Sequence, residues 1–278
     1  MKDPVRKLAV LGSPIAHSRS PALHRAAYRV LGLPWEYGSA EVASGELGGF
    51  LSGLDDSWRG LSLTMPLKRE ILPLLGGRDA VTDLVGAANT VLFDDGRVLG
   101  FNTDVYGAEM MLAECLPGTL RRALILGSGA TASSMLAALA RRGVEEVVVA
   151  ARTPENAGGL ITVADRLGVA IAVGGFDTDP GAPDVVVSTL PGTAESGGGF
   201  SQELRSSVPL VDIAYDPWPS AVAGHWLEAG GVVNSGLGML IHQAIAQVRI
   251  FVGGDPGRVL PDEEGVLAAM REAALGRS

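Results

Sequence analysis

Cysteine is nearly absent from this chain: the 278-residue sequence contains one, Cys115. Because a disulfide needs two cysteines, none can form within the chain. For the same reason, a metal bound by Cys115 would have no second cysteine ligand. The histidines show neither HExxH spacing nor a nearby acidic pair suited to zinc. They are His17, His24, His225 and His242. The sequence therefore predicts no metal site.

Basic residues are also scarce, since 22 lysines and arginines face 31 acidic residues, for a formal net charge of -9. They are not gathered with aromatic residues into a stripe, so we expect no nucleic-acid partner. No apolar run is long enough to span a membrane, and the run near the amino terminus is shorter than a signal-peptide core. We therefore expect a soluble, cytoplasmic protein that works without a membrane.

The chain has the length of two ordinary domains, and its 47% hydrophobic content supports real cores. Strand-like runs alternate with helical patterns through residue 75, which favours a mostly parallel sheet with helices against it. In the segment 89–104, Asp95-Gly96 separates two apolar runs, so we expect an antiparallel hairpin at one edge of this sheet. The alternation restarts near residue 122 and indicates a second α/β domain.

Two regions fall outside this alternation. The glycine-rich stretch at 192–199 is predicted to be a mobile loop. The segments 236–253 and 261–275 have helical patterns with no strand left to alternate with, so they could pack on either domain.

The strongest local signal is LILGSGATA at residues 124–132, a short apolar strand followed by G-x-G-x-x-A spacing and then a helix. This is the dinucleotide-binding fingerprint in its required context. Glycines let the backbone approach a pyrophosphate, and free N–H groups at the start of the helix bind the anion. We place cofactor contacts at Gly127, Ser128, Gly129, Ala130 and Thr131.

The identity of the dinucleotide depends on the end of the next strand, in VVVAART. An NAD site usually has a carboxylate there for the ribose 2′-hydroxyl, whereas this sequence has Arg152. The planar guanidinium suits a 2′-phosphate, so NADP is favoured over NAD. Glu155 lies close in the sequence and would repel that phosphate.

Lys68, in LTMPLKREI, occupies an unfavourable place. Pro66 is well suited to begin a helix, which puts Lys68 in the first turn, where a cation is mildly disfavoured. It is either a solvated surface lysine or a functional one. Asp104, in GFNTD, either caps the helix that follows or joins Lys68 as an acid/base pair, since an amine and a carboxylate can share one substrate hydroxyl.

The segment GSPIAHSRSP places Ser18 and Ser20 just before a helix. Two hydroxyls beside a helix N-terminus form a plausible seat for a small carboxylate without an arginine. Ser20 can also be explained as the N-cap of that helix, with Pro21 as its first residue.

Taken together, these stretches resemble the shikimate dehydrogenase family over nearly the whole chain. The motifs that carry the resemblance are GSPIAHSRSP, SLTMPLK, GAANT, GFNTD, DIAYDP and GLGMLIHQA. The sequence departs from the family pattern where Ser62 and Leu63 replace Asn-Val, and where Ala151 replaces the asparagine of N-R-T. A further departure is Asn156, which stands where many members of the family carry a second basic residue of the cofactor site in addition to the arginine.

The resemblance implies a role for individual residues. Lys68 and Asp104 fall on the catalytic pair, and Ser18 and Ser20 on the carboxylate site. The residues that match the remaining substrate contacts are Thr64, Asn89, Asp104, Tyr215 and Gln243. Further cofactor contacts are implied at Thr153, Ile213 and Gly236.

The resemblance also implies an interrupted domain order. Residues 1–103 and 237–278 would form a substrate domain and residues 104–236 an NADP-binding Rossmann domain, with the substrate in a cleft between them. We expect a two-domain α/β enzyme that reversibly reduces 3-dehydroshikimate to shikimate with NADP, in aromatic amino acid biosynthesis. An NAD-dependent quinate/shikimate dehydrogenase and a noncatalytic sensor of dinucleotide and ligand remain as alternatives. The oligomeric state is open, with a homodimer as one option.

Overall fold

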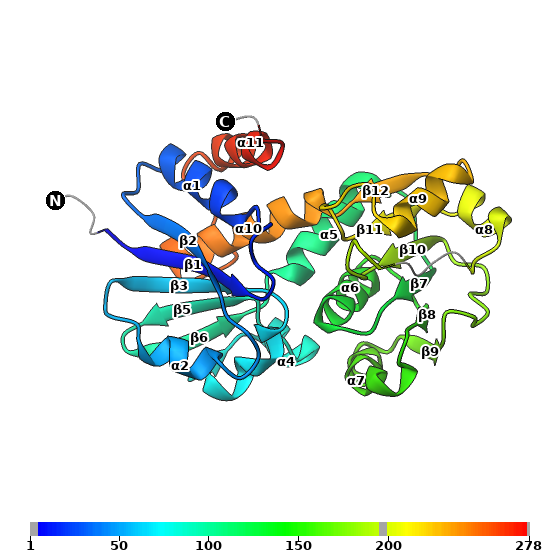
Figure 1. Ribbon diagram of the computed structural model, residues 1–278, viewed down its shortest axis with the longest axis horizontal. Coiled ribbons are helices and arrows are strands. Elements are labelled where there is room, and N and C mark those ends of the chain that lie inside the picture. Colours follow the sequence, from blue (N-terminus) through cyan, green and yellow to red (C-terminus); the bar gives the residue numbers. More distant parts are fainter. Residues whose placement is uncertain (1–4, 195–198, 277–278) are drawn as a thin grey trace. The chain divides into compact units, whose positions relative to one another are not determined.

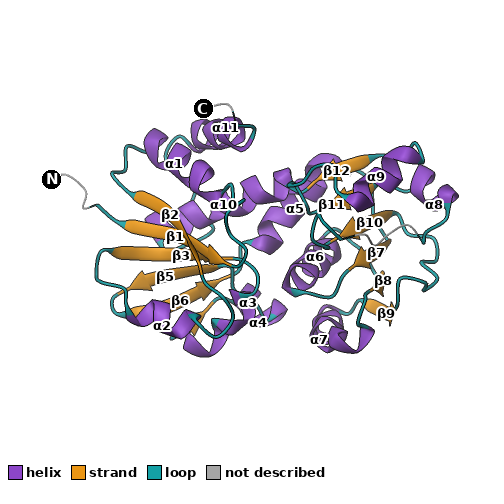
Figure 2. Cartoon of the chain, viewed as in Figure 1, coloured by secondary structure: helices purple, strands orange, loops and turns teal. Residues whose placement is uncertain are grey.

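The computed structural model describes residues 5–194 and 199–276 and divides the chain into two compact units (Figures 1 and 2). Unit 1 comprises Met1–Gly107 and Leu240–Ser278, and unit 2 comprises Ala108–Met239. Residues 195–198, half of the stretch predicted to be a mobile loop, lie outside the described part. No helix in the described part is both long enough and apolar enough to cross a membrane.

Unit 1 is built on a six-stranded sheet with the order β2-β1-β3-β5-β6-β4. Its strands are β1 (Lys7–Gly12), β2 (Glu36–Glu41), β3 (Trp58–Leu63), β4 (Gly77–Arg78), β5 (Thr90–Asp94) and β6 (Arg97–Phe101). Strand β1 pairs in parallel with β2 and β3, and β5 runs antiparallel to both β3 and β6. The predicted parallel strands and hairpin are therefore confirmed.

The hairpin turn has the geometry that its sequence predicts. Asp95 and Gly96 both have positive φ, 47° and 72°, which suits the twist of the flanking strands. The hairpin does not form the edge of the sheet, however, because β4 pairs in parallel with β6 outside it. This two-residue strand is too short to leave a periodic pattern in the sequence.

Helices cover both faces of this sheet. The helices of unit 1 are α1 (Ser20–Val30), α2 (Leu47–Ser52), α3 (Leu67–Glu70), α4 (Ala80–Val85), α10 (Leu237–Gly253) and α11 (Glu263–Ala274), with a single 3₁₀ turn at Leu72–Leu74. Helix α5 (Asp104–Cys115) begins in unit 1 and ends in unit 2. Figure 1 shows α1, α10 and α11 on one side of the sheet and α2 on the other.

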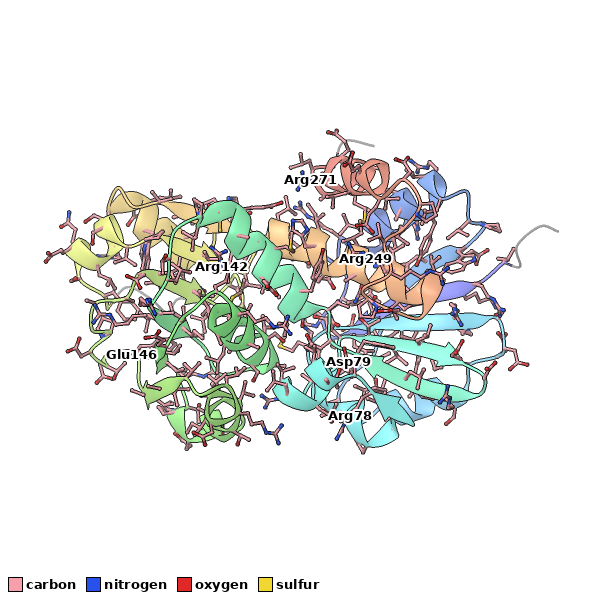
Figure 3. The ribbon with its side chains drawn as sticks, turned by 180° about the vertical axis from the view of Figure 1, so that it is seen from behind. Arg78, Asp79, Arg142, Glu146, Arg249 and Arg271 are labelled. Carbon is pink, nitrogen blue, oxygen red and sulfur yellow. The ribbon has the colours of Figure 1, made fainter. Side chains whose placement is uncertain are left out.

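Two contacts show how α10 is held in unit 1. A Cβ atom at Gly60 of β3 would collide with the Phe251 ring, so the missing side chain lets α10 pack close to the sheet. On the other side of α10, Arg249 Nε donates to Glu263 Oε2 of α11 over 2.9 Å, and the same arginine is labelled in Figure 3. Gln243 and Gln247, on the same helix, are thereby fixed relative to the strands.

Beneath α10 lies a buried aromatic group centred on His24 of α1. The His24 ring stacks on Tyr37 with ring centroids 4.0 Å apart and 9° between the planes. Its Nδ1 atom lies 3.3 Å from the Tyr28 hydroxyl. Burial lowers the pKa of His24 from 6.5 to about 3, so the imidazole is neutral in the folded protein at neutral pH.

Acid is expected to destabilise the fold through His24. Below about pH 6.5 His24 binds a proton in the unfolded chain but stays neutral in the folded chain. The free energy of unfolding therefore falls as the pH drops toward about 3. At about pH 5 the loss from this group is about 2 kcal/mol, from about 1.36 kcal/mol per pKa unit. Denaturant titrations of wild type and His24→Phe, which keeps an aromatic ring, measure it. Identical pH dependence in the two proteins would contradict the assignment.

Unit 2 contains a second six-stranded sheet, and its strands are all parallel, in the order β12-β11-β10-β7-β8-β9. They are β7 (Arg122–Leu126), β8 (Glu146–Ala150), β9 (Ala170–Gly174), β10 (Val185–Ser188), β11 (Leu210–Asp212) and β12 (Val233–Ser235). Counted along the chain, this is the 3-2-1-4-5-6 order of the Rossmann fold. The predicted fold class is thus confirmed, and the order reverses between β7 and β10.

The connections of unit 2 run over both faces of its sheet. They contain α6 (Ala130–Arg141), a 3₁₀ turn at Pro154–Ala157, α7 (Gly158–Leu167), α8 (Gln202–Ser207) and α9 (Ala221–Glu228). Leu204 of α8 and Trp226 of α9 pack against Leu124 and Val186 of the sheet. The connection from β9 to β10 contains no helix.

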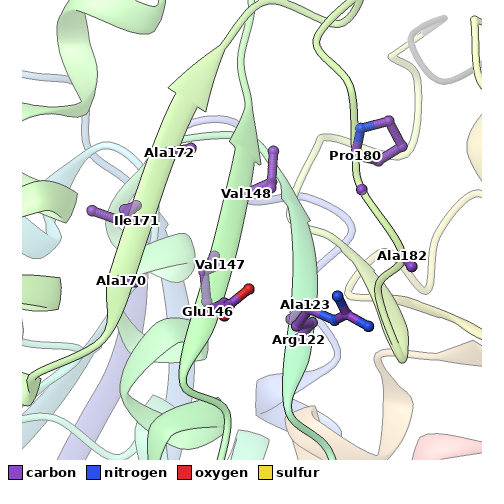
Figure 4. Close-up of a pocket in the computed structure, with 11 residues that line it drawn as sticks. Arg122, Ala123, Glu146, Val147, Val148, Ala170, Ile171, Ala172, Pro180 and Ala182 are labelled. Atoms are coloured by element: carbon purple, nitrogen blue, oxygen red, sulfur yellow. The ribbon is translucent and has the colours of Figure 1, made fainter.

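A cavity of about 280 Å³ lies beside that connection (Figure 4). It is lined by the first residues of β7, β8 and β9 and by the loop that carries Pro180 and Ala182. The glycine-rich turn follows the last residue of β7. This cavity therefore lies at the edge of the sheet opposite the predicted dinucleotide site.

Candidate active site

Lys68 lies on α3, the single helical turn that follows β3. The sequence predicted that Pro66 is the first helical residue. In the structure the helix begins at Leu67, and Pro66 is its N-cap. Because a four-residue helix aligns few peptide dipoles, the expected electrostatic penalty on Lys68 is small. The backbone of this turn is tied to the sheet, since Ala88 N donates to Lys68 O over 2.8 Å.

Lys68 and Asp104 form an ion pair. Lys68 Nζ donates to Asp104 Oδ2 over 2.7 Å, and the two side chains are 13% and 6% exposed. This burial excludes a solvated surface lysine. The amine and the carboxylate that the sequence suggested as a pair are brought together across 36 residues of chain.

Asp104 is the first residue of α5, and its side chain faces the pair rather than capping the helix. Asn102 Oδ1 accepts a hydrogen bond of 3.2 Å from Val105 N and so takes the capping role. The second carboxylate oxygen, Asp104 Oδ1, accepts a hydrogen bond of 2.9 Å from Asn89 Nδ2. Both oxygens are therefore held, and the carboxylate has a fixed orientation toward Lys68.

Asn89 connects the pair to the surrounding residues. Its Oδ1 atom accepts hydrogen bonds from Thr103 N, at 2.8 Å, and from the Thr90 hydroxyl, at 2.9 Å. Its Nδ2 atom donates to Asp104 and also lies 3.3 Å from Gln243 Oε1 of α10. Thr90 and Thr103 were not singled out from the sequence, although each is adjacent to a residue that was.

Ser18 and Ser20 lie on the loop and helix that follow β1. Ser20 is the first helical residue of α1 and not its N-cap, so that prediction is wrong: Arg19 is the N-cap and makes no side-chain capping bond. Instead Ser18 Oγ accepts a long hydrogen bond, 3.4 Å, from Ser20 N. The Ser18 hydroxyl is the acceptor in this bond, so its own proton is not used there.

Thr64 follows β3 and lies against the end of β1. Its N–H donates to Leu11 O over 2.9 Å, and Ser13 N donates to Met65 O over 3.0 Å. These two bonds join the loop that carries the serines to the loop that leads to Lys68. Ser18, Ser20 and Thr64 thus lie on segments that follow the adjacent strands β1 and β3.

In unit 2 the glycine-rich turn has the geometry that an anion site needs. Gly127 has a φ of 103°, and a Cβ atom there would lie 2.6 Å from Thr189 Oγ1. Gly129 is the N-cap of α6 and has no side chain to bond to the first N–H groups of that helix. Those groups, on Ala130 and Thr131 among others, remain available to a phosphate.

The other predicted cofactor residues of unit 2 follow different strands of the same parallel sheet. Arg152 is exposed and follows β8, with Thr153 beside it. Ile213 follows β11 and Gly236 follows β12, and a Cβ atom at Gly236 would collide with Ile213 O. Tyr215 is half-buried, two residues beyond Ile213. All of them lie at the carboxyl edge of the sheet, where open α/β sheets bind ligands.

A Rossmann sheet with an uncapped glycine turn in one unit, and a buried lysine–aspartate pair in the other, define a two-domain dehydrogenase that uses a dinucleotide. Comparisons with known proteins identify the family. Residues 10–91 match the model of the shikimate dehydrogenase substrate binding domain. The shikimate dehydrogenase (NADP(+)) of Moorella thermoacetica is 32% identical over 97% of this chain and 97% of that protein. The chain belongs to the shikimate dehydrogenase family.

Solved structures agree with this assignment. The crystal structure of Mycobacterium tuberculosis shikimate dehydrogenase has a TM-score of 0.82 and 42% identity, covering 95% of this chain and 98% of that one. The Thermus thermophilus enzyme in complex with NADP(H) and shikimate has a TM-score of 0.77 and 32% identity, covering 96% and 99%.

Proposed function

We propose that this protein catalyses the reversible, NADP-dependent reduction of 3-dehydroshikimate to shikimate, a step of aromatic amino acid biosynthesis. The observation that carries the proposal is the buried Lys68–Asp104 pair, 2.7 Å apart, in a family of NADP-dependent shikimate dehydrogenases. Shikimate and NADP(H) occur together in the Thermus thermophilus relative. We further propose that the protein works in the cytoplasm and has no nucleic-acid or membrane partner. A homodimer is one option for its oligomeric state.

Lys68 and Asp104 are assigned the proton transfer. In reduction, the Lys68 ammonium donates a proton to the oxygen that becomes the hydroxyl, and in oxidation the neutral amine takes that proton back. Asp104 holds the ammonium through Oδ2, while Asn89 holds Asp104 through Oδ1. In reduction, bound NADPH would supply a hydride to the carbon that bears this oxygen, and in oxidation NADP+ would accept the hydride from that carbon.

The remaining residues of unit 1 are assigned to substrate binding. Thr64, Asn89 and Gln243 bind ring hydroxyls together with Asp104, and the hydroxyls of Ser18 and Ser20 bind the carboxylate. Tyr215 is proposed as a further substrate contact. Residues 1–103 and 237–278 are accordingly proposed as the substrate domain, and the family-model match at 10–91 lies inside it.

The residues of unit 2 fit a dinucleotide. The left-handed Gly127 and the uncapped start of α6 suit a pyrophosphate, so we assign residues 127–131 to it. Arg152 would bind the 2′-phosphate that distinguishes NADP, with Thr153 beside it. Ile213 and Gly236 are proposed as the remaining contacts, within an NADP-binding domain of residues 104–236.

Ser18→Ala is expected to raise the KM for shikimate about tenfold, because it removes a hydrogen bond to a charged carboxylate. The affinity for NADP should not change. Ser13→Ala, on the same loop, is the matched control, since its hydroxyl donates to Glu41 Oε1 over 2.9 Å. An unaltered KM for shikimate in Ser18→Ala would show that the carboxylate binds elsewhere.

The activity itself is tested by incubating the purified protein with 3-dehydroshikimate and NADPH. We expect NADPH to be consumed in equal amount to the shikimate formed, with shikimate identified by its mass. A folded protein that binds NADPH but forms no shikimate would contradict the proposal and favour a noncatalytic sensor.

A further inference from the structure

Gln247 is a fully buried amide on α10, one helical turn beyond Gln243, and it does not belong to the substrate-binding set above. It is 1% exposed. Its Nε2 atom donates to Asn89 O, at 3.2 Å, and to Thr90 Oγ1, at 3.1 Å. Both amide hydrogens of Gln247 are therefore used on the Asn89–Thr90 dipeptide.

The oxygen of the same amide is held from the other side. Gln247 Oε1 accepts a hydrogen bond of 2.8 Å from the Ser62 hydroxyl and lies 3.1 Å from His24 Nε2. The Tyr37 hydroxyl donates in turn to Ser62 Oγ over 2.5 Å. Since an amide oxygen only accepts, His24 carries its proton on Nε2, and its Nδ1 accepts from Tyr28. The two donors at Oε1 fix which end of the Gln247 amide faces Thr90.

This orientation determines where the hydroxyl proton of Thr90 goes. Because Thr90 Oγ1 receives an N–H from Gln247, its own proton is free to reach Asn89 Oδ1, 2.9 Å away. With Oδ1 occupied in this way, the Asn89 amide presents Nδ2 to Asp104 Oδ1. The reversed amide would place an oxygen against the carboxylate and would lose the bond.

We propose that Gln247 is a positioning residue, which acts through Thr90 to keep the Asn89 amide donating to Asp104. The consequence for activity rests on the proposed function, because it assumes that Asp104 and Asn89 work in the shikimate reaction. The Gln247 side chain makes its hydrogen bonds with His24, Ser62, Asn89 and Thr90, and not with Lys68 or Asp104. It is also not among the residues proposed to bind the substrate. Thr103 N also donates to Asn89 Oδ1, so the effect of losing Gln247 is partial.

Gln247→Met tests the proposal, since methionine has a similar length but no hydrogen-bonding amide. We expect kcat/KM for shikimate to fall about three- to tenfold, the effect of one neutral hydrogen bond, with NADP affinity unchanged. Ile250→Val is the matched control on the same buried helix: it lowers the melting temperature through packing and leaves kcat/KM unchanged. A Gln247→Met enzyme that loses melting temperature but keeps kcat/KM would overturn the proposal.

The route through Thr90 is tested with two substitutions at that position. Thr90→Ser keeps the hydroxyl and should retain kcat/KM, whereas Thr90→Val loses the hydroxyl and should resemble Gln247→Met. Because both residues act on Asn89 in series, the kcat/KM of the double variant Gln247→Met/Thr90→Val should be no lower than that of the less active single variant. Effects that multiply in the double variant would overturn the series arrangement.

A measurement without substrate separates this inference from the proposed function. Proton–nitrogen NMR spectra of the ligand-free protein report the side-chain amide of Asn89, assigned by its loss in Asn89→Ala. In Gln247→Met and Thr90→Val this signal should shift and exchange faster with solvent, and in Ile250→Val and Thr90→Ser it should stay in place. An Asn89 signal that is unchanged in Gln247→Met would overturn the inference, even if the protein reduces 3-dehydroshikimate as proposed. If the protein lacks that activity, the shifted signal still supports the positioning of Asn89.

Discussion

Lys68→Met is expected to lower kcat by about 10² to 10⁴, the usual range for a lost general acid or base. Methionine keeps most of the length and the apolar stem of lysine but cannot give or take a proton. Affinity for shikimate should change far less, because the residues proposed to bind the ring hydroxyls, Thr64, Asn89 and Gln243, are unchanged. Initial rates and ligand titrations of the same preparation measure both quantities.

Arg69→Met is the matched control, because Arg69 is an exposed cation on the same helical turn and should tolerate the change. The stability of Lys68→Met should fall, since Asp104 would remain 6% exposed without its cation. The sequence alone predicts that Lys68→Met would raise the stability slightly, because it removes a cation from a helix N-terminus. The loss of the buried ion pair outweighs that gain. Turnover near the wild-type value in Lys68→Met would show that another group transfers the proton.

Arg152→Ala should weaken NADP binding by roughly ten- to a hundredfold and leave NAD binding nearly unchanged. Only NADP carries the 2′-phosphate, and a hydrogen bond to a charged group contributes roughly 1.5 to 3 kcal/mol. Titration of the purified variant with each cofactor measures the difference.

Glu155→Gln is the companion variant, since it removes a negative charge close to Arg152 in the sequence. It should tighten NADP binding slightly and leave NAD binding unchanged, a change of opposite sign to that of Arg152→Ala. Equal losses for NADP and NAD in Arg152→Ala would contradict the assignment of the 2′-phosphate site.

The fold could be predicted from local patterns wherever an element is long enough to show its period. The strand–glycine–helix fingerprint at 124–132 and the Asp95-Gly96 turn each specify a backbone conformation, and the structure contains both. Strand β4, at Gly77–Arg78, could not be predicted, because a two-residue strand has no period. Its pairing with β6 is a tertiary contact that no local rule specifies.

The candidate site could be predicted only in part, for a similar reason. Lys68 and Asp104 were singled out because each occupies a turn or helix start that a stability argument does not fully explain. Their separation of 2.7 Å depends on strands far apart in the sequence. Gln247 and His24 were not found, because a single polar residue in an apolar helical pattern gives no sign of its partners. The one available signal was two glutamines a helical turn apart on α10.

The central claim is tested most directly by initial rates of nicotinamide reduction with shikimate or quinate as substrate and NADP or NAD as cofactor. Shikimate with NADP should give the highest kcat/KM of the four combinations, with the rate lost in Lys68→Met. A preference for quinate with NAD would instead identify the quinate/shikimate dehydrogenase alternative. No reduction in any combination, by a folded protein that binds both ligands, would contradict the enzymatic function altogether.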